Sequence, residues 1–120
     1  MNPTLKDKDL VLVKKFDLKL KNNDIVIVKK NGRIIIKRLV GLPNDRIKID
    51  KYLYVNNKKN DNFYIESCER INEEIQLKSN EYFVLGDNRQ NSIDSRNEEI
   101  GLITKEEIIG KIIFFKKGEL

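Results

Sequence analysis

The chain carries at residues 86–96 the stretch Gly86-Asp87-Asn88-Arg89-Gln90-Asn91-Ser92-Ile93-Asp94-Ser95-Arg96. It follows an apolar run over residues 82–85 that is typical of a β-strand. Its side chains are short hydrogen-bonding groups and Arg forks, whereas solvated loops usually include Lys and Glu. Asp94 is spaced to pair with Arg96, and Asp87 with Arg89. The composition therefore favours a buried network of mutually satisfied polar groups over a solvated loop.

A chain of 120 residues supports one domain with a modest core. Apolar residues make up 39% of it and charged residues 36%, and the net charge is +5. The lysines recur in pairs after apolar runs, which is typical of solvated strand ends. Because no set of stacking aromatic side chains accompanies them, we expect no nucleic-acid partner.

Two residue types are scarce or missing. Cys68 is the single cysteine, so no disulfide can form within the chain. Histidine is absent, which excludes a Ser-His-Asp triad, a Cys-His pair and most zinc sites. A hydrolase built on this chain needs another base, and we expect neither a metal nor a cofactor. No apolar stretch approaches the length that spans a bilayer.

The remaining pattern predicts a mainly β protein. Residues 9–15 and 24–30 share one pattern of Asp, branched apolar residues and two Lys, and such continuous apolar runs predict strands covered on both faces. Asn31-Gly32 predicts a hairpin into a strand over residues 33–40. Further elements are predicted as a hairpin over 47–55, a helical turn capped by Thr104 and a closing strand over 108–115 with a bulge at Gly110.

Lys37 has an unusual place in the strand over residues 33–40. Side chains alternate along a strand, so Ile35, Lys37 and Leu39 share one face. An ammonium group in an apolar row is poorly solvated, which lowers its pKa toward neutrality, as a lysine base requires. Taken by itself, the strand also allows an edge lysine whose head reaches solvent.

Two blocks of the sequence identify a family. The motif Gly-Asp-Asn-Arg-x-Asn-Ser-x-Asp-Ser-Arg resembles the most specific block of type I signal peptidases, the serine/lysine proteases that remove signal peptides from exported proteins. Residues 37–46 are similar to the lysine-bearing segment of that family, with Asn44 where the family usually has Gly. Order and spacing also match over nearly the whole chain.

The resemblance implies an antiparallel β-sheet or partly open barrel core. It implies one catalytic-core domain over residues 1–120, with a small cap-like insertion at about residues 56–80. A cap this short is similar to that of compact Gram-positive-type members.

The resemblance also assigns roles to residues. Lys37 would be the general base for a Ser nucleophile, and the hydroxyl of Ser92 would orient its amine. Structural support would come from Asp87, Asn88, Arg89, Asp94, Ser95 and Arg96. The substrates implied are preproteins whose signal-peptide end is extended, carries an Ala-x-Ala pattern and adds as a strand. Its shallow pockets would be lined by Met1, Leu5, Ile35 and Ile36.

The nucleophile implied by the resemblance would lie just upstream of residue 1. The family carries Ser-Met-x-Pro-Thr-Leu, and this chain begins at the Met of that motif, so the Ser would immediately precede Met1. We therefore expect residues 1–120 alone to be inactive. Pro3 predicts an extended start. The family's membrane anchor also lies upstream, which implies a single-pass protein of the cell membrane with its catalytic domain on the extracytoplasmic side.

Two other interpretations stay open at this point. The first is a naturally non-catalytic homologue that acts as a binding or assembly factor, although such a protein has no reason to retain Lys37. The second is a repressor-type serine/lysine autoprotease, for which the sequence offers neither a DNA-binding segment nor a self-cleavage site.

Overall fold

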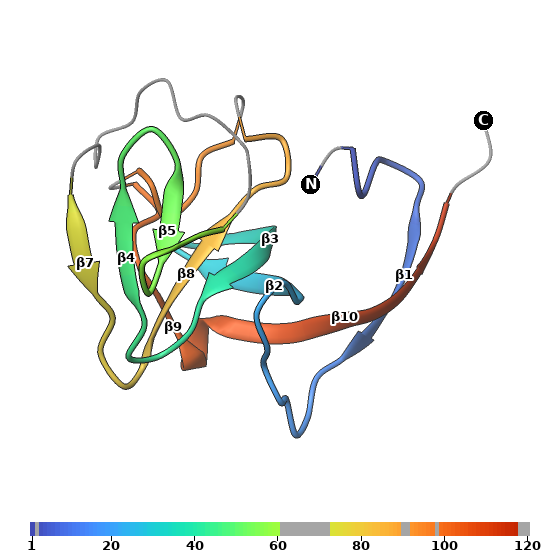
Figure 1. Ribbon diagram of the computed structural model, residues 1–120. Coiled ribbons are helices and arrows are strands. Elements are labelled where there is room, and N and C mark those ends of the chain that lie inside the picture. Colours follow the sequence, from blue (N-terminus) through green and yellow to red (C-terminus); the bar gives the residue numbers. More distant parts are fainter. Residues whose placement is uncertain (2, 61–72, 90–91, 98, 118–120) are drawn as a thin grey trace.

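The computed structural model describes residues 1, 3–60, 73–89, 92–97 and 99–117, which form two antiparallel sheets (Figure 1). The larger sheet has the strand order β1-β10-β2-β3-β8-β9, and the smaller has the order β6-β5-β4-β7. The larger sheet consists of β1 (Leu10–Lys14), β2 (Ile25–Lys30), β3 (Arg33–Gly41), β8 (Glu81–Leu85), β9 (Ile103–Thr104) and β10 (Ile108–Lys116). The smaller consists of β4 (Arg46–Ile49), β5 (Leu53–Val55), β6 (Lys58–Lys59) and β7 (Glu74–Gln76). Neither sheet closes into a barrel within the described residues, and the predicted mainly β fold is confirmed.

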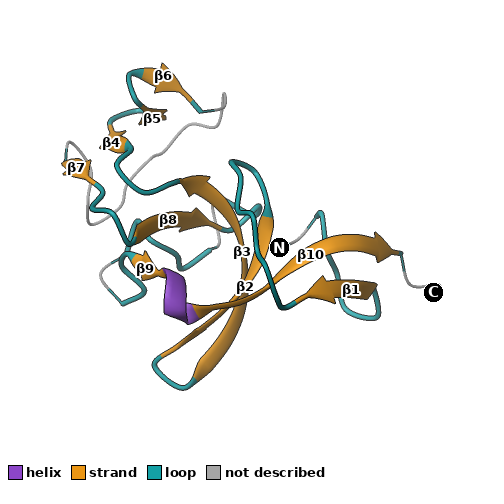
Figure 2. Ribbon diagram, turned by 90° about the horizontal axis from the view of Figure 1, so that it is seen from below, coloured by secondary structure: helices purple, strands orange, loops and turns teal. Residues whose placement is uncertain are grey.

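The smaller sheet lies at one end of the molecule, beside β8 and β9 of the larger sheet (Figure 1). Figures 1 and 2 show the smaller sheet at one end, and β1 with the distal part of β10 at the other. The strand β3 leads from the larger sheet into the turn before β4 and so connects them. Among the described residues no helix is long and apolar enough to cross a membrane.

The β2–β3 hairpin positions the lysine-bearing strand. These strands pair in unbroken register from Ile25↔Arg38 to Lys30↔Arg33. The connecting residues Asn31 and Gly32 have φ values of 52° and 75°. Two positive φ values are what a two-residue type I′ turn needs, and Asn-Gly adopts them at little cost. The predicted hairpin is therefore confirmed.

Three apolar clusters hold the sheets. One includes Phe83, Ile47 and Leu53, and it joins side chains of the smaller sheet to those of β8. A second, around Val26, Leu39 and Val84, includes the partly buried Ile35. The third consists of Leu5, Ile25 and Ile112 with partly buried neighbours that include Met1 and Ile36. Because neighbouring side chains of β3 enter different clusters, this strand is packed on both faces.

Two predictions about the first residues are wrong. The strand β1 is not covered on both faces, since Leu10 is 68% and Leu12 58% exposed. Among the described residues β1 pairs only with β10, at the edge of the larger sheet, and its Leu10 and Leu12 side chains face solvent. The start of the chain is a turn rather than extended, because the Leu5 amide donates to the Met1 carbonyl at 3.0 Å. Pro3 is compatible with such a turn because its fixed φ suits a first helical position.

The other predicted elements are found. The 47–55 hairpin is β4 with β5, and the predicted helical turn is the 3₁₀ helix η1 (Lys105–Glu107). β10 shifts register between Ile108 and Gly110, as expected for a bulge. Of the predicted cap at 56–80, residues 61–72 lie outside the described residues, while β6 and β7 belong to the smaller sheet. The single-domain boundary stays a prediction.

Candidate active site

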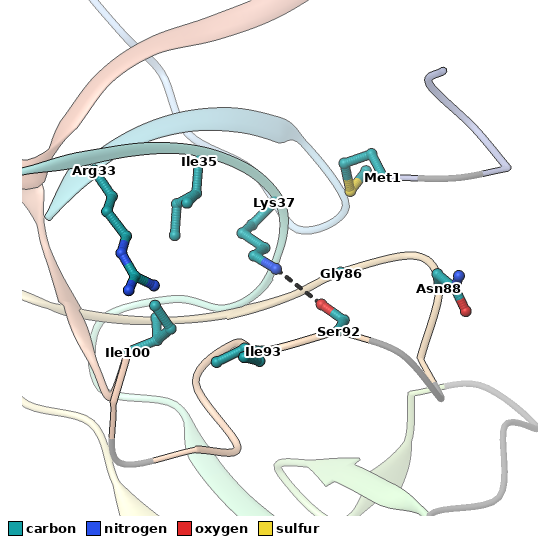
Figure 3. Close-up of a pocket in the computed structure, with 9 residues that line it drawn as sticks. All are labelled: Met1, Arg33, Ile35, Lys37, Gly86, Asn88, Ser92, Ile93 and Ile100. Atoms are coloured by element: carbon teal, nitrogen blue, oxygen red, sulfur yellow. Dashed lines mark hydrogen bonds between the residues drawn. The ribbon is translucent and has the colours of Figure 1, made fainter. Parts of the chain in front are cut away.

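Lys37 projects from β3 toward the loop that follows β8. Its Nζ donates a hydrogen bond to Ser92 Oγ at 2.8 Å (Figure 3). Register brings the two segments together, because Arg38 pairs with Leu85 at the end of β8 and the next residue, Gly86, opens the loop. Two residues that are 55 positions apart in sequence thus form an amine–hydroxyl pair.

The surroundings of Lys37 shift its protonation equilibrium toward the neutral form. Burial among apolar side chains lowers the pKa of Lys37 below its ordinary value of 10.5. The negative charge of Asp94 acts in the opposite direction, and the positive charge of Arg96 lowers the pKa further. A neutral amine can accept a proton, so the direction of this shift suits a base.

Asp94 organises the loop from its centre. It is fully buried, and its carboxylate pairs with Arg96, whose Nε lies 2.9 Å from Oδ1 and whose Nη2 lies 2.9 Å from Oδ2. The same carboxylate accepts the backbone amides of Gly86 at 3.0 Å and Arg96 at 3.1 Å. A buried charge with this many donors is satisfied. Asp94 therefore holds both ends of the loop that presents Ser92.

Ser95 and Arg89 brace the same loop. The Val84 amide donates to Ser95 Oγ at 3.0 Å, and the Ser95 amide donates to the Val84 carbonyl at 3.1 Å. Arg96 Nη2 also donates to the Arg89 carbonyl at 2.8 Å. The loop is thus attached to the end of β8 by main-chain and side-chain bonds, and the predicted buried polar network is present.

The network extends to Arg38 and Thr4, to which the sequence pattern assigned no role. Asp87 accepts two hydrogen bonds from Arg38, each 2.8 Å long, and a third from the Thr4 hydroxyl. Burial acts to raise the pKa of Asp87. The hydrogen bonds from Arg38 and Thr4 and the positive charges of Arg38 and Arg89 outweigh burial and hold this pKa below its usual value. The Asp87 carboxylate therefore joins three parts of the site: Thr4 in the N-terminal turn, Arg38 on β3 and the loop that carries Ser92. The sequence contained one indication of this role, namely that Arg38 directly follows Lys37.

Gly86 is a further residue whose role the sequence did not reveal. A Cβ at this position would lie 1.9 Å from Ser92 Oγ and 3.3 Å from Lys37 Nζ. No side chain fits in that space, so the glycine leaves room for the amine–hydroxyl pair. Its place at the head of the loop motif was the only hint in the sequence.

An open pocket of about 420 Å³ surrounds the pair. Its lining residues are Met1, Arg33, Ile35, Lys37, Gly86, Asn88, Ser92, Ile93 and Ile100 (Figure 3). Of the residues predicted to bind substrate, Met1 and Ile35 line it, whereas Leu5 and Ile36 pack in the cluster with Ile25 and Ile112. The described residues include no group of three or more His, Cys, Asp or Glu side chains that could hold a metal.

Comparisons with known proteins identify the family to which the chain belongs. Residues 1–116 match the family described as "Signal peptidase, peptidase S26". The chain is 39% identical to signal peptidase I U of Bacillus subtilis (strain 168), and the match covers 100% of this chain and 73% of that protein. It is 33% identical to signal peptidase I of Bacillus amyloliquefaciens, over 100% of this chain and 74% of that one.

A solved structure also shares the fold. The crystal structure of a signal peptidase I from Enterococcus faecalis V583 superimposes with a TM-score of 0.61 at 29% identity, over 78% of this chain and 97% of that chain. Sequence, fold and the match over residues 1–116 point the same way. The chain that pairs Lys37 with Ser92 therefore belongs to the type I signal peptidases, a family of proteases that process signal peptides.

Proposed function

We propose that this chain is the catalytic core of an enzyme that removes signal peptides from exported preproteins, with Lys37 as the general base. The observation that carries the proposal is the hydrogen bond of 2.8 Å between Lys37 Nζ and Ser92 Oγ, in surroundings that lower the pKa of the amine. Ser92 orients the amine, and the network of Asp87, Asp94 and Arg96 keeps both in place.

The proposed reaction is hydrolysis through an acyl-enzyme. A Ser immediately before Met1 supplies the hydroxyl that attacks the scissile carbonyl, and Lys37 takes its proton. The amine then returns that proton to the leaving amino group and later deprotonates the water that releases the acyl group. Met1 lines the same pocket as Lys37, and the Cα of a residue directly before Met1 lies about 3.8 Å from the Met1 Cα, which supports this position for the nucleophile.

The nucleophile also contributes to binding the oxyanion. Its own backbone amide is a donor for the negative charge that develops on the carbonyl oxygen. The 120 residues of this chain, expressed without that Ser, would lack both the attacking hydroxyl and this donor, and are proposed to be inactive.

The substrate is proposed to bind as an added strand along β3. β2 pairs with Arg33 to Arg38 on one edge of β3, while β8 pairs on the other edge from Arg38 onward. Residues 33–37 therefore have an edge with no strand partner among the described residues. An extended peptide can hydrogen-bond to such an edge. In this proposal Met1, Leu5, Ile35 and Ile36 line the shallow apolar sites along the bound peptide, which carries an Ala-x-Ala pattern.

The domain is proposed to act at the extracytoplasmic surface of the cell membrane, next to an anchor upstream of Met1. Support comes from β1, where the exposed Leu10 and Leu12 precede Lys14 and Lys15 and the 81% exposed Phe16. Apolar side chains flanked by lysines suit the interface of an anionic bilayer.

The test is a cleavage assay on the chain extended upstream by Ser and its preceding residues. A peptide that carries an Ala-x-Ala site should be cut by the extended chain, and not by its Lys37→Ala variant or by the unextended chain. If the extended chain binds the peptide but never cuts it, the protein is a non-catalytic homologue. If the unextended chain cuts at a comparable rate, the assigned roles are wrong.

A further inference from the structure

Arg33 places a positive charge at one end of the candidate active-site pocket. It is the first residue of β3, and side chains alternate along a strand, so Arg33, Ile35 and Lys37 project from the same face. All three line the pocket, and Figure 3 shows them side by side along β3. The catalytic proposal uses Lys37 and Ile35 but gives no role to this guanidinium group.

The partner of Arg33 holds it weakly. Arg33 Nη1 lies 3.1 Å from Glu99 Oε1, and the two side chains are 63% and 51% exposed. Ion pairs this exposed contribute little to stability, because water screens them. The Glu99 carbonyl also accepts a long, exposed hydrogen bond of 3.5 Å from Asn31 Nδ2. A second carboxylate could therefore share or replace Glu99 on the Arg33 fork.

The distance along the strand indicates which substrate residue would meet Arg33. Residues 33 and 37 are four apart, which is about 13 Å along a strand. In the proposed binding mode the cut lies at Lys37 and the residues before it run along β3 toward Arg33. The side chain nearest to Arg33 would then belong to the fourth or fifth residue before the cut.

The faces of the strand decide between these two. Leu5 and Ile36 belong to a cluster apart from that of Ile35 and lie outside the pocket lining. In the proposed binding mode the small first and third residues of the substrate lie beside Leu5 and Ile36. Alternation turns the second and fourth substrate residues to the face of Arg33, Ile35 and Lys37. The fourth residue is therefore the one that meets the guanidinium.

We infer that Arg33 is a specificity-determining residue that favours an acidic side chain at the fourth position before the cleaved bond. A carboxylate there would pair with the guanidinium, while a lysine would be repelled by it. This inference rests on the proposed function, because it needs the peptide to lie along β3. The alternative is that Arg33 and Glu99 form a surface ion pair that has no influence on which substrates are cleaved.

The test uses the Ser-extended chain and three peptides that differ only at the fourth residue before the cut, which is Glu, Gln or Lys. We expect kcat/KM to fall from Glu to Gln to Lys, by about threefold to fivefold between the extremes, as is usual for exposed charge pairs. The order should arise in KM rather than kcat, since the contact is remote from the reacting bond. It should fade near 1 M salt, where the Debye length is about 3 Å.

Two variants separate a direct contact from a general charge effect. The charge exchange R33E/E99R keeps an ion pair in place and should reverse the order of the peptides. Arg33→Gln should make the peptides nearly equal. The matched control is R46E/E74R, which exchanges another exposed pair, 3.4 Å apart on the smaller sheet, and should leave the original order intact.

Each outcome decides something different. Equal cleavage of the three peptides by the Ser-extended chain overturns the inference while leaving the proposed function standing. Retention of the Glu preference in R33E/E99R overturns it as well. If even the Gln peptide is not cut, the proposed function fails instead. In that case the dissociation constants of the three labelled peptides are measured on the unextended chain, which leaves the peptides intact. A role of Arg33 then predicts that the Glu peptide binds most tightly and the Lys peptide least tightly.

Discussion

The carboxylate of Asp87 and the guanidinium of Arg38 form a two-point ion pair, with Oδ1 2.8 Å from Nε and Oδ2 2.8 Å from Nη2. Arg38 directly follows Lys37 on β3, and Asp87 directly follows Gly86 in the loop that presents Ser92. This pair therefore fixes the distance between the strand that carries the amine and the loop that carries the hydroxyl. The Thr4 hydroxyl adds the N-terminal turn to the same carboxylate.

Replacing Asp87 with Asn should destabilise the fold in a pH-dependent way. Hydrogen bonds from Arg38 and Thr4 hold the pKa of Asp87 below its ordinary 3.8. The stabilisation from its charge is complete above that ordinary value and is lost as pH falls through the lower pKa of the folded state. We expect Asp87→Asn to lower the free energy of unfolding by about 1–3 kcal/mol at pH 7.

Urea unfolding at pH 7 and near pH 2 measures this effect. The gap between Asp87→Asn and the parent chain should shrink at the lower pH, while the exposed Asp50→Asn serves as control and should show no gap. A gap of equal size at both pH values would contradict a role for the carboxylate charge.

Replacing Ser92 with Ala should reduce cleavage by the Ser-extended chain by about 10²-fold while changing stability little. The variant removes the 2.8 Å hydrogen bond that orients the Lys37 amine, yet Ser92 is half-buried and its loss leaves no buried group unsatisfied apart from that amine. Kinetics with a peptide substrate give the rate, and thermal unfolding gives the stability. Unchanged kcat/KM would remove Ser92 from the mechanism.

Ser95→Ala is expected to behave in the opposite way. Ser95 is fully buried, and its hydroxyl accepts the Val84 amide at 3.0 Å. Removing the acceptor leaves a buried amide unpaired, which costs about 1–3 kcal/mol. Stability should therefore fall more than for Ser92→Ala, and a drop in kcat/KM should follow the fraction of folded protein. If Ser95→Ala is as stable as the parent, the bracing role of this serine is wrong.

Gly86→Ala should disrupt the amine–hydroxyl pair by filling the space beside it. The new methyl group would fall 1.9 Å from Ser92 Oγ, so the Ser92 side chain must move away from Lys37. We expect kcat/KM to fall by about 10²-fold, as for the loss of Ser92 itself. The same clash should destabilise the fold. In a Ser92→Gly background Gly86→Ala should therefore destabilise it much less, because the clash is gone. Equal destabilisation in both backgrounds would show that the cause is elsewhere.

Lys37→Met should stabilise the fold at neutral pH while abolishing cleavage. A lysine whose pKa is lowered by folding binds a proton less readily in the folded than in the unfolded state, so its burial costs stability at pH values below the folded pKa. Replacing the charge by an apolar side chain of similar length should recover on the order of 1 kcal/mol. The gain should shrink as pH rises toward 10.5, where both states lose the proton. Lys48→Met, at an exposed position of β4, is the control.

Much of this arrangement could be predicted from the sequence where local chemistry decides it. Asn31-Gly32 requires positive φ at both positions, so the hairpin was predictable. Asp94 and Arg96 are two residues apart, and their pairing needs no knowledge of the fold. Lys37 was identified as unusual because it places a charge between Ile35 and Leu39 on one face of its strand.

The relationships that escaped prediction depend on tertiary packing. Arg38 and Asp87 are 49 positions apart, and their contact exists because β3 pairs with β8. Leu10 and Leu12 are exposed on β1, which lies at the edge of the larger sheet, and the apolar run alone reveals neither fact. Likewise, Gly86 is needed because of what lies opposite it in space, since nothing in the local sequence demands a glycine there.

The proton affinity of the Lys37 amine tests the central claim most directly. Lysines labelled with ¹³C at Cε can be titrated by NMR in the folded chain, with Lys37→Met identifying the signal. The account predicts that the pKa of Lys37 lies below 10.5, and that Ser92→Ala alters its titration. A Lys37 signal that titrates at or above 10.5, and that Ser92→Ala leaves unchanged, would contradict the account.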